Sequence, residues 1–173
     1  MTTAEEVFAA LDGMGIAYNR AAHAPAHHIE DCIPIARSMG ATVCKNYFLT
    51  TKSKRLYALL LTRPEARLVT KDVSRQAGTP RLMFAEEAPL EAMLRTHPGA
   101  VSPMGLVFDR EQSVRFLMDR SLLALPRLAF HPCDNTMTLA MSTRDFTDRF
   151  LPATGHGVTY VDIRDTIEAS EER

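Results

Sequence analysis

The sequence predicts an α+β fold: a single domain in which helices surround a mixed, mostly antiparallel β-sheet or barrel. Strand-like runs follow one another in hairpin-like pairs, and helical segments stand between the pairs. The 173 residues contain no linker, repeat or low-complexity stretch, and this length suits one hydrophobic core. We expect residues 1–163 to form the domain and residues 164–173 to form a polar C-terminal tail.

The first half of the chain is expected to begin with a helix. Thr3 and Glu6 have the spacing of a capping box, so a helix should follow as far as Gly13 or Gly15. A short strand is expected at 16–20, and the segment 28–39 is ambiguous because Pro34 would interrupt a helix there. Two strands, 43–51 and 55–62, are expected around a polar hairpin turn. A helix at 70–77 would be capped by Thr70 and ended by Gly78.

The second half predicts a helix, then strands, then a late helix. Ser142 and Asp145 have the spacing of a helix cap, and a loop rich in glycine and proline precedes the strands. In order, the expected elements are a helix from Pro89 to Arg95, the loop 97–103, paired strands at 106–108 and 114–119, two further strands at 127–131 and 136–141, a helix at 142–151, and a last strand at 158–163.

The composition predicts a cytoplasmic protein with no membrane partner. Hydrophobic residues make up 46% of the chain and charged residues 24%, an ordinary globular balance. The longest purely apolar run, residues 56–61, is too short to span a bilayer, and the N-terminus lacks the features of a secretion signal. Cys32, Cys44 and Cys133 form no C-x-x-C pair, and their odd number favours reduced thiols.

Positive charge is concentrated in one segment. Residues 41–82 hold nine basic and two acidic side chains, a net charge of +7, whereas the flanking parts of the chain are acidic. This segment either contacts a polyanion or forms a solvated face paired with acidic residues elsewhere. For a polyanion, the candidate contacts are Arg67, Lys71 and Arg75, the last two being one turn apart on the expected helix.

Familiar catalytic motifs are missing, so any chemistry must come from less stereotyped residues. The chain has no G-x-S-x-G elbow of a serine hydrolase and no glycine-rich nucleotide loop. Lys45 shares a strand face with Tyr47 and Leu49, and its amine therefore either meets an anionic group or reaches back to water. Asn46 shares the opposite face with Phe48.

Two further segments carry candidate chemistry. A short loop runs from Gly99 to Pro103. Either its backbone N–H groups bind a carbonyl oxygen or an oxyanion, or the loop is an ordinary connecting turn. His131 is an acid, a base, a pocket wall or a structural histidine at a strand end, and Asn135 shapes the turn that follows.

The remaining histidines and cysteines do not predict a metal site. His23 and His27 have helical spacing, and Asp31 or Cys32 stands nearby, but Pro25 lies between the two histidines. No second ligand pair with a recognisable spacing follows. Cys44 is adjacent to Lys45, but neighbouring strand residues point to opposite faces, so we expect Cys44 to be a buried structural residue outside the lysine's pocket.

Taken together, these segments resemble the YbaK/ProX family of aminoacyl-tRNA-editing domains. Residues 45–49, K-N-Y-F-L, resemble the family's K-N-L-F-L strand, and residues 99–106 resemble its G-S-V-S-P-F-G-L loop. Residues 131–139 resemble its H-P-x-x-N-T-A-T-V segment, and residues 142–156 resemble the helix that closes the domain. The resemblance covers nearly the whole chain, and three motifs in the same order at the family's separations make it specific.

The resemblance implies a free-standing hydrolase that removes a wrong amino acid from tRNA without a cofactor or metal. The ribose hydroxyl beside the ester would assist the reaction. Lys45, Gly99 and Pro103 would form the catalytic set. The substrate would be bound by further residues of the three motifs, 45–49, 99–106 and 131–139. These are Asn46, Ala100, Val101, Ser102, His131 and Asn135.

The resemblance also suggests the substrate. His131, in its F-H-P setting, most resembles the branch that removes alanine from proline tRNA, and a prolyl-tRNA synthetase is an expected partner. Tyrosine at 47, alanine at 100, and methionine at 104 and 137 depart from the family pattern, which leaves the amino-acid preference open. The alternatives are a deacylase for cysteine, serine or another amino acid, and a catalytically silent module that binds tRNA or a synthetase.

Overall fold

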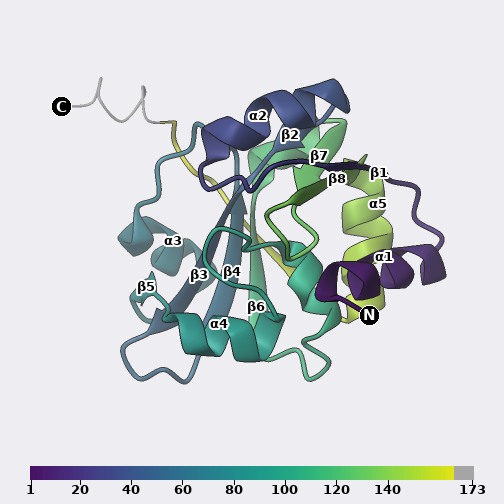
Figure 1. Ribbon diagram of the computed structural model, residues 1–173. Helices are drawn as coiled ribbons and strands as arrows, with labels where there is room; N and C mark the ends of the chain where they lie inside the picture. The colour runs from purple at the N-terminus through teal and green to yellow at the C-terminus, as the bar shows by residue number, and fades with distance from the viewer. Residues whose placement is uncertain (166–173) are drawn as a thin grey trace.

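The computed structural model describes residues 1–165, so positions 166–173 of the expected tail lie outside the described residues (Figure 1). The strands are β1 (Asn19–Ala22), β2 (Thr42–Val43), β3 (Lys45–Thr51), β4 (Tyr57–Thr62), β5 (Leu82–Phe84), β6 (Val114–Asp119), β7 (Arg127–Phe130), β8 (Met137–Ser142) and β9 (Val158–Val161). The helices are α1 (Thr3–Gly13), α2 (Ile29–Ser38), α3 (Thr70–Ala77), α4 (Glu87–Leu94), α5 (Thr143–Asp145) and α6 (Leu151–Thr154), with 3₁₀ turns η1 (Pro103–Val107) and η2 (Arg120–Ala124) and the π-helical turn η3 (Phe146–Phe150).

The strands form two sheets that pack on a shared core. One sheet has the order β1-β8-β7-β2 and the other has the order β5-β3-β4-β6-β9. The hairpins β3–β4 and β7–β8 and the edge pairs β1–β8 and β3–β5 are antiparallel, whereas β2–β7, β4–β6 and β6–β9 are parallel. Helices stand on both sides of the sheets (Figure 1). The predicted α+β class with a mixed sheet is therefore confirmed, and both sheets stay open, so the described strands close no barrel.

The first helix is capped one residue earlier than expected. Thr2 Oγ1 accepts a hydrogen bond from the Glu5 N–H at 3.1 Å, and the Glu5 carboxylate accepts one from the Thr2 N–H at 2.7 Å. The alternative partner, Glu6, instead forms an ion pair with Arg95 at 2.8 Å. The capping box predicted at Thr3 and Glu6 is therefore wrong by one residue, because two overlapping pairs have the same spacing.

The ambiguous segment at 28–39 is helical in spite of its proline. Pro34 lies inside α2, where it lacks the N–H that the turn would use. Cys32 and Ala36, on the opposite side of the helix from the exposed Pro34, pack against Val43 and neighbouring alanines of the four-stranded sheet. Burial of this apolar face outweighs the local cost of the proline.

The predicted hairpin at 43–62 and the helix at 70–77 are confirmed. β3 and β4 pair in antiparallel register, and Gly78 ends α3 in the left-handed conformation at φ 68°. The cap residue of α3 is Val69 and not Thr70. α4 begins at Glu87, before Pro89, which lies in its first turn.

The strand predicted at 106–108 is wrong. Ser102 Oγ accepts from the Met104 N–H at 3.1 Å, and Pro103 follows as the first residue of a 3₁₀ turn, so the chain coils at this point. The apolar Leu106 enters the core from that turn. β6 consequently pairs in parallel with β4 and β9, partners that lie far away in the sequence.

The C-terminal elements largely follow expectation. β7 and β8 form the predicted hairpin, and Ser142 Oγ accepts from the Asp145 N–H at 3.0 Å as a helix cap. The helix that follows runs through α5, η3 and α6 to Gly155. β1 begins at Asn19, later than the expected strand at 16–20, and β9 ends at Val161.

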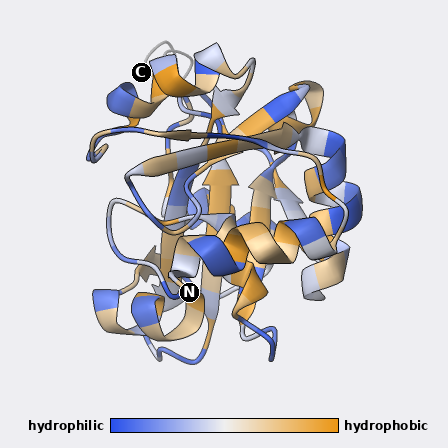
Figure 2. Cartoon of the chain, turned by 45° about the vertical axis from the view of Figure 1, so that its right-hand side comes forward, coloured by the Kyte–Doolittle hydropathy of each residue, from blue (hydrophilic) through white to orange (hydrophobic). Residues whose placement is uncertain are grey.

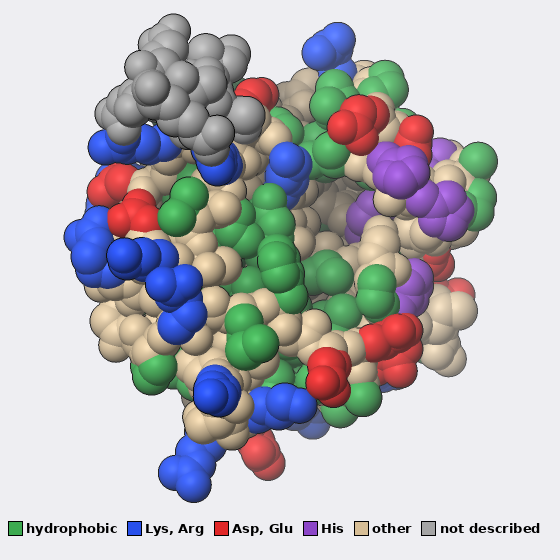
Figure 3. Space-filling model, turned by 90° about the vertical axis from the view of Figure 1, so that its left-hand side faces the viewer, with side chains coloured by type: hydrophobic (Ala, Val, Ile, Leu, Met, Phe, Trp, Pro, Cys, Tyr) green, Lys and Arg blue, Asp and Glu red, His purple; other side chains and the backbone are tan. Residues whose placement is uncertain are grey.

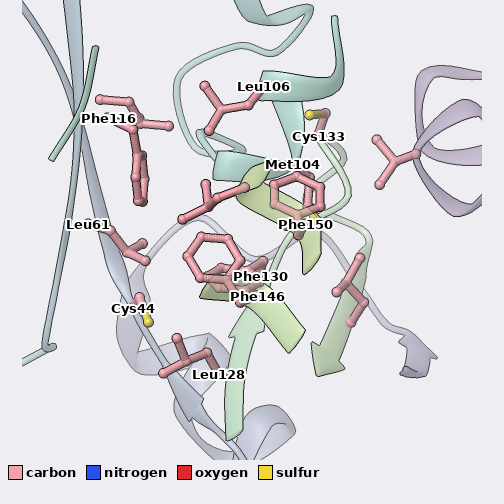
Figure 4. Packing of buried hydrophobic residues seen from close by; sticks show 14 of the residues in the cluster. Cys44, Leu61, Met104, Leu106, Phe116, Leu128, Phe130, Cys133, Phe146 and Phe150 are labelled. Atoms are coloured by element: carbon pink, nitrogen blue, oxygen red, sulfur yellow. The ribbon is translucent and has the colours of Figure 1, made fainter. Parts of the chain in front are cut away.

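Aromatic rings fill the space between the two sheets. Figure 4 shows Phe146 and Phe130 close together, with Phe116 and Leu61 approaching from the five-stranded sheet. The ring centroid of Phe146 lies 5.0 Å from that of Phe130, 5.8 Å from that of Phe116 and 5.5 Å from that of Phe150. Hydrophobic residues are concentrated on the inner strands, and the surrounding helices show polar residues outward (Figure 2).

Other features of the chain bear on its environment. No helix of residues 1–165 has the length and apolar character needed to cross a membrane. All three cysteines are buried, and none takes part in a disulfide.

Candidate active site

A pocket of about 330 Å³ lies where the two sheets and α2 meet. In Figure 3 histidines border a hollow on this face of the molecule. The lining residues come from the loop before α2, from α2, from the end of β2 through the first half of β3, from the loop before η1, from β7 and the residue after it, and from β8. They are Ala26, His27, His28, Ile29, Cys32, Val43, Cys44, Lys45, Asn46, Tyr47, Gly99, Val101, Ala129, Phe130, His131 and Thr138.

The pocket forms where the chain crosses from one sheet to the other. Val43 ends β2, which pairs with β7, and Lys45 begins β3, which pairs with β4. Cys44 lies between the two strands, so the alternation of a continuous strand does not apply there. Cys44 and Lys45 consequently line the same pocket, contrary to the sequence expectation.

Cys44 is nevertheless the buried structural residue that was predicted. Its side chain is 4% exposed, and its Sγ lies 3.8 Å from the Thr42 carbonyl oxygen. Burial raises the pKa of the Cys44 thiol far above its ordinary value, so the sulfur stays protonated and is a poor nucleophile.

Asn46 presents an unpaired acceptor in the wall of the pocket. Its Nδ2 donates to the Cys44 carbonyl oxygen at 3.2 Å, which fixes the amide orientation. Its Oδ1 is buried and has no hydrogen-bond partner in the described part of the chain. An unsatisfied buried acceptor costs roughly 1–3 kcal/mol, so this oxygen favours a ligand that brings an N–H or O–H donor. The half-buried Lys45 lines the same pocket and supplies a positive charge.

The loop before η1 contributes only part of the predicted set to the pocket wall. Gly99 and Val101 line the pocket, and Gly99 has a φ of 90°, a conformation that favours glycine. Ala100 is fully buried, and its N–H already donates to the His97 carbonyl oxygen at 3.0 Å. Ser102 and Pro103 are buried at the start of η1, where they hold the loop in place.

His131 forms the opposite wall as a neutral ring. Its Nδ1 donates to the Met137 carbonyl oxygen at 2.7 Å, which leaves a lone pair on Nε2. Cys32 Sγ lies 3.6 Å from that Nε2, and burial raises the pKa of the Cys32 thiol. Burial also lowers the pKa of His131, and the ring is therefore uncharged at neutral pH.

Asn135 lies away from the pocket. It lies in the turn between β7 and β8, and its backbone carbonyl oxygen accepts from the Ala26 N–H at 3.0 Å. This bond ties the loop before α2 to the turn, so that Ala26 can line the pocket.

The histidine cluster divides between the pocket and the framework. His23 Nε2 lies 2.8 Å from Thr138 Oγ1, and His27 and His28 line the pocket. Within residues 1–165 no group of three or more histidine, cysteine or acidic side chains has an arrangement that could hold a metal. Sequence reasoning had not placed Thr138 or Cys32 in the site, because their partners lie roughly a hundred residues away along the chain.

The three candidate tRNA contacts lie outside the pocket wall. Arg67, Lys71 and Arg75 are exposed, and Arg75 forms an ion pair with Asp72. Part of the basic excess is structural, because Arg63 pairs with the buried Asp119 at 3.0 Å. On the face in Figure 3, Lys and Arg side chains gather along the left edge, and hydrophobic side chains run down the middle beside the hollow.

Comparisons with known proteins show the family of the chain. The family model described as "Aminoacyl-tRNA editing domain" matches residues 23–148, which include every pocket residue. The "Prolyl-tRNA editing protein ProX" of Acetoanaerobium sticklandii is 30% identical over 156 residues, covering 90% of this chain and 94% of that protein. "Prolyl-tRNA synthetase associated domain-containing protein 1" of Danio rerio is 33% identical over 136 residues, covering 78% and 73%.

The fold is also shared with solved structures. A structure described as that of a candidate trans-editing enzyme for prolyl-tRNA synthetase has a TM-score of 0.71 at 19% identity, covering 95% of this chain and 98% of the other. The family match extends over most of the chain, and the lysine strand, the glycine loop and the histidine that resemble the family all reach one pocket. The chain therefore belongs to the aminoacyl-tRNA editing domain family.

Proposed function

We propose that the protein removes alanine from mischarged proline tRNA by hydrolysis of the aminoacyl ester. The observation that carries the proposal is the unpaired buried Asn46 Oδ1 in a pocket that Lys45 also lines. The α-ammonium group and the ribose hydroxyls of an aminoacyl-tRNA end supply the donors that this oxygen lacks. The names of two relatives, which refer to prolyl-tRNA editing and prolyl-tRNA synthetase, support proline tRNA as the carrier.

The reaction makes modest demands on the protein because the substrate is an activated ester. Water attacks the carbonyl carbon, the bond from that carbon to the ribose oxygen breaks, and the ribose oxygen leaves with a proton. The neighbouring ribose hydroxyl is well placed to assist this proton transfer. Lys45 would neutralise charge at the terminal adenosine or the reacting ester, and backbone N–H groups of Gly99 and Val101 would face the developing oxyanion.

The pocket walls favour a small amino acid. Ala129, Cys32 and the neutral ring of His131 narrow the space on the side of the four-stranded sheet. In the aminoacylation site of a tRNA synthetase, the binding free energies of two amino acids that differ by one methylene differ by only about 1–3 kcal/mol. A second, smaller site is therefore needed to remove the smaller wrong amino acid. The F-H-P setting of His131 most resembles the branch of the family that removes alanine, and cysteine and serine are the alternatives for the same pocket.

A deacylation panel tests the proposed substrate. Purified protein with proline tRNA carrying alanine, cysteine, serine or proline should release alanine fastest and leave prolyl-tRNA largely intact, as measured by loss of labelled amino acid from the RNA. Faster release of cysteine or serine would assign the protein to another branch of the family. Release of none of the four would identify it as a silent binding module.

Removal of the Lys45 charge should nearly abolish hydrolysis. In Lys45→Ala, the pocket keeps its shape but loses the cation that faces the substrate, so kcat/KM on alanyl-adenosine should fall at least about 100-fold, a loss of ~2.7 kcal/mol or more of transition-state stabilisation. Lys52→Ala, an exposed lysine in the turn of the same hairpin, is the matched control and should hydrolyse this substrate normally. Normal turnover by a folded Lys45→Ala protein would remove the lysine from the mechanism.

Replacement of Asn46 should separate activity from stability. Asn46→Ala removes the acceptor for a charged donor, so kcat/KM should fall about 10- to 150-fold, equivalent to ~1.5–3 kcal/mol. The free energy of unfolding should change by less than about 1 kcal/mol, because loss of the bond to Cys44 is offset by removal of an unsatisfied buried oxygen. Enzyme kinetics and urea unfolding measure the two effects. A large loss of stability with unchanged kinetics would make Asn46 a structural residue.

Salt dependence should report on the basic surface. Replacing Arg67, Lys71 and Arg75 with glutamine should flatten the dependence of tRNA binding on salt, because each lost phosphate contact reduces the slope by about 0.7–0.9. Hydrolysis of alanyl-adenosine should be unaffected. Arg144→Gln, on α5 at the other side of the molecule, is the control. An unchanged slope in the triple variant would mean that the three residues form a solvated face.

A further inference from the structure

An exposed aromatic ring lies next to the pocket, in contact with one of its lining residues. Phe84, at the end of the edge strand β5, is 64% exposed, the largest value for a large hydrophobic side chain within residues 1–165 after the N-terminal methionine. Its ring centroid lies 6.2 Å from that of Tyr47, with the rings tilted by 51°. Tyr47 in turn lines the pocket. The two rings therefore make an aromatic surface that begins in the pocket wall and ends in solvent.

The register of the strands explains how Phe84 comes close to the pocket residue Tyr47. β5 is antiparallel to β3, with Leu82 opposite Thr51 and Phe84 opposite Leu49. The last residue of β5 thus approaches the end of β3 that begins at Lys45. Because alternate residues share a face, Phe84 lies on the same side of the sheet as Leu82, the side that α3 covers.

Positive charge borders the same surface. α3 is fastened to β5 by a hydrogen bond from the Leu82 N–H to Ser74 Oγ at 2.8 Å, and it carries the exposed Lys71 and Arg75. Arg81, the residue before β5, is also exposed. In Figure 3 basic side chains lie along one edge of the face, with hydrophobic side chains between them and the hollow.

We propose that Phe84, supported by Tyr47, is a stacking platform for an unpaired nucleotide of the tRNA 3′ end. This inference rests on the proposed function, which places the terminal adenosine at the pocket mouth. A nucleotide that precedes it must then cross the adjoining surface, where an exposed ring offers a face to its base and basic side chains offer counter-ions to its phosphates. A wholly apolar partner would make no contact with the charges of the exposed Lys71 and Arg81.

Binding of uncharged RNA tests the platform separately from catalysis. The probes are two acceptor-stem hairpins, one ending in the unpaired CCA and one blunt, with binding measured by fluorescence anisotropy. Wild-type protein should bind the hairpin with the overhang more tightly. Phe84→Ala should weaken that binding about 5- to 150-fold, the effect of losing one base stacked on an aromatic ring, and leave blunt-hairpin binding unchanged.

Three further variants distinguish stacking from other effects. Phe84→Trp should retain tight binding, and Phe84→Leu, apolar but without a ring, should bind as weakly as Phe84→Ala. Met83→Ala is the control for the neighbouring surface, because Met83 is 49% exposed on the same strand and lines the same small surface pocket as Phe84, but carries no ring on which a base could stack. It should bind both hairpins like the wild type.

The outcomes separate this inference from the proposed activity. Loss of overhang binding in Phe84→Ala supports the platform even if the protein releases no amino acid, in which case only the proposed activity fails. Three results would overturn the platform: no preference for the overhang in the wild type, an unchanged preference in Phe84→Ala, or equal weakening for both hairpins. Each does so whether or not deacylation is observed.

Discussion

The packing of Phe146 between the two sheets positions the rest of the structure. This one fully buried ring contacts Phe130 of the four-stranded sheet, Phe116 of the five-stranded sheet and Phe150 one turn along its own helix. Protein interiors are close-packed, so a buried ring that contacts both sheets leaves them little room to move closer or apart. The ring of Phe146 therefore fixes the separation of the two sheets. The pocket lies along the same interface, and His131, which directly follows Phe130, is held in its wall by that packing.

The electrostatic character of the pocket follows from this placement. Closely packed sheets exclude water, so burial keeps His131 neutral and the thiols of Cys32 and Cys44 protonated. Among the described residues that line the wall, Lys45 is the one basic side chain apart from the histidines, and Asn46 Oδ1 is an unpaired acceptor. Such a site orients an ester and stabilises charge on it, but it offers no activated nucleophile. This fits a substrate that is already reactive.

Local patterns predicted the parts of this structure that depend on local forces. The hairpin of β3 and β4, the glycine end of α3 and the Ser142 cap were readable because turn and cap chemistry acts over a few residues. The three segments that supply Lys45, Gly99 and His131 carry local motifs, and the structure brings them together in one pocket.

The failures concern contacts between distant residues. The thiol of Cys32 approaches His131 across 99 positions, and β6 joins β4 and β9 in parallel, neither of which leaves a local signal. A strand was predicted at 106–108, where the 3₁₀ turn 103–107 ends, because apolar residues enter the core there in a short run. Cys44 was misplaced because alternation was assumed to continue through a crossing between two sheets.

On the proposed function, the pocket alone cannot complete the task. A small cavity that accepts alanine recognises it equally well on the tRNA to which alanine belongs and on the tRNA for proline. Discrimination between the two must therefore come from nucleic-acid contacts outside the cavity, since specificity is a difference of affinities that the shared amino acid cannot supply. The exposed charges of α3 and the ring of Phe84 are the features of residues 1–165 that extend from the pocket side toward such contacts. Phosphate and stacking contacts give affinity and position but do not distinguish one base sequence from another. They would hold the acceptor end in place while other side chains of the protein contact base edges near the stem.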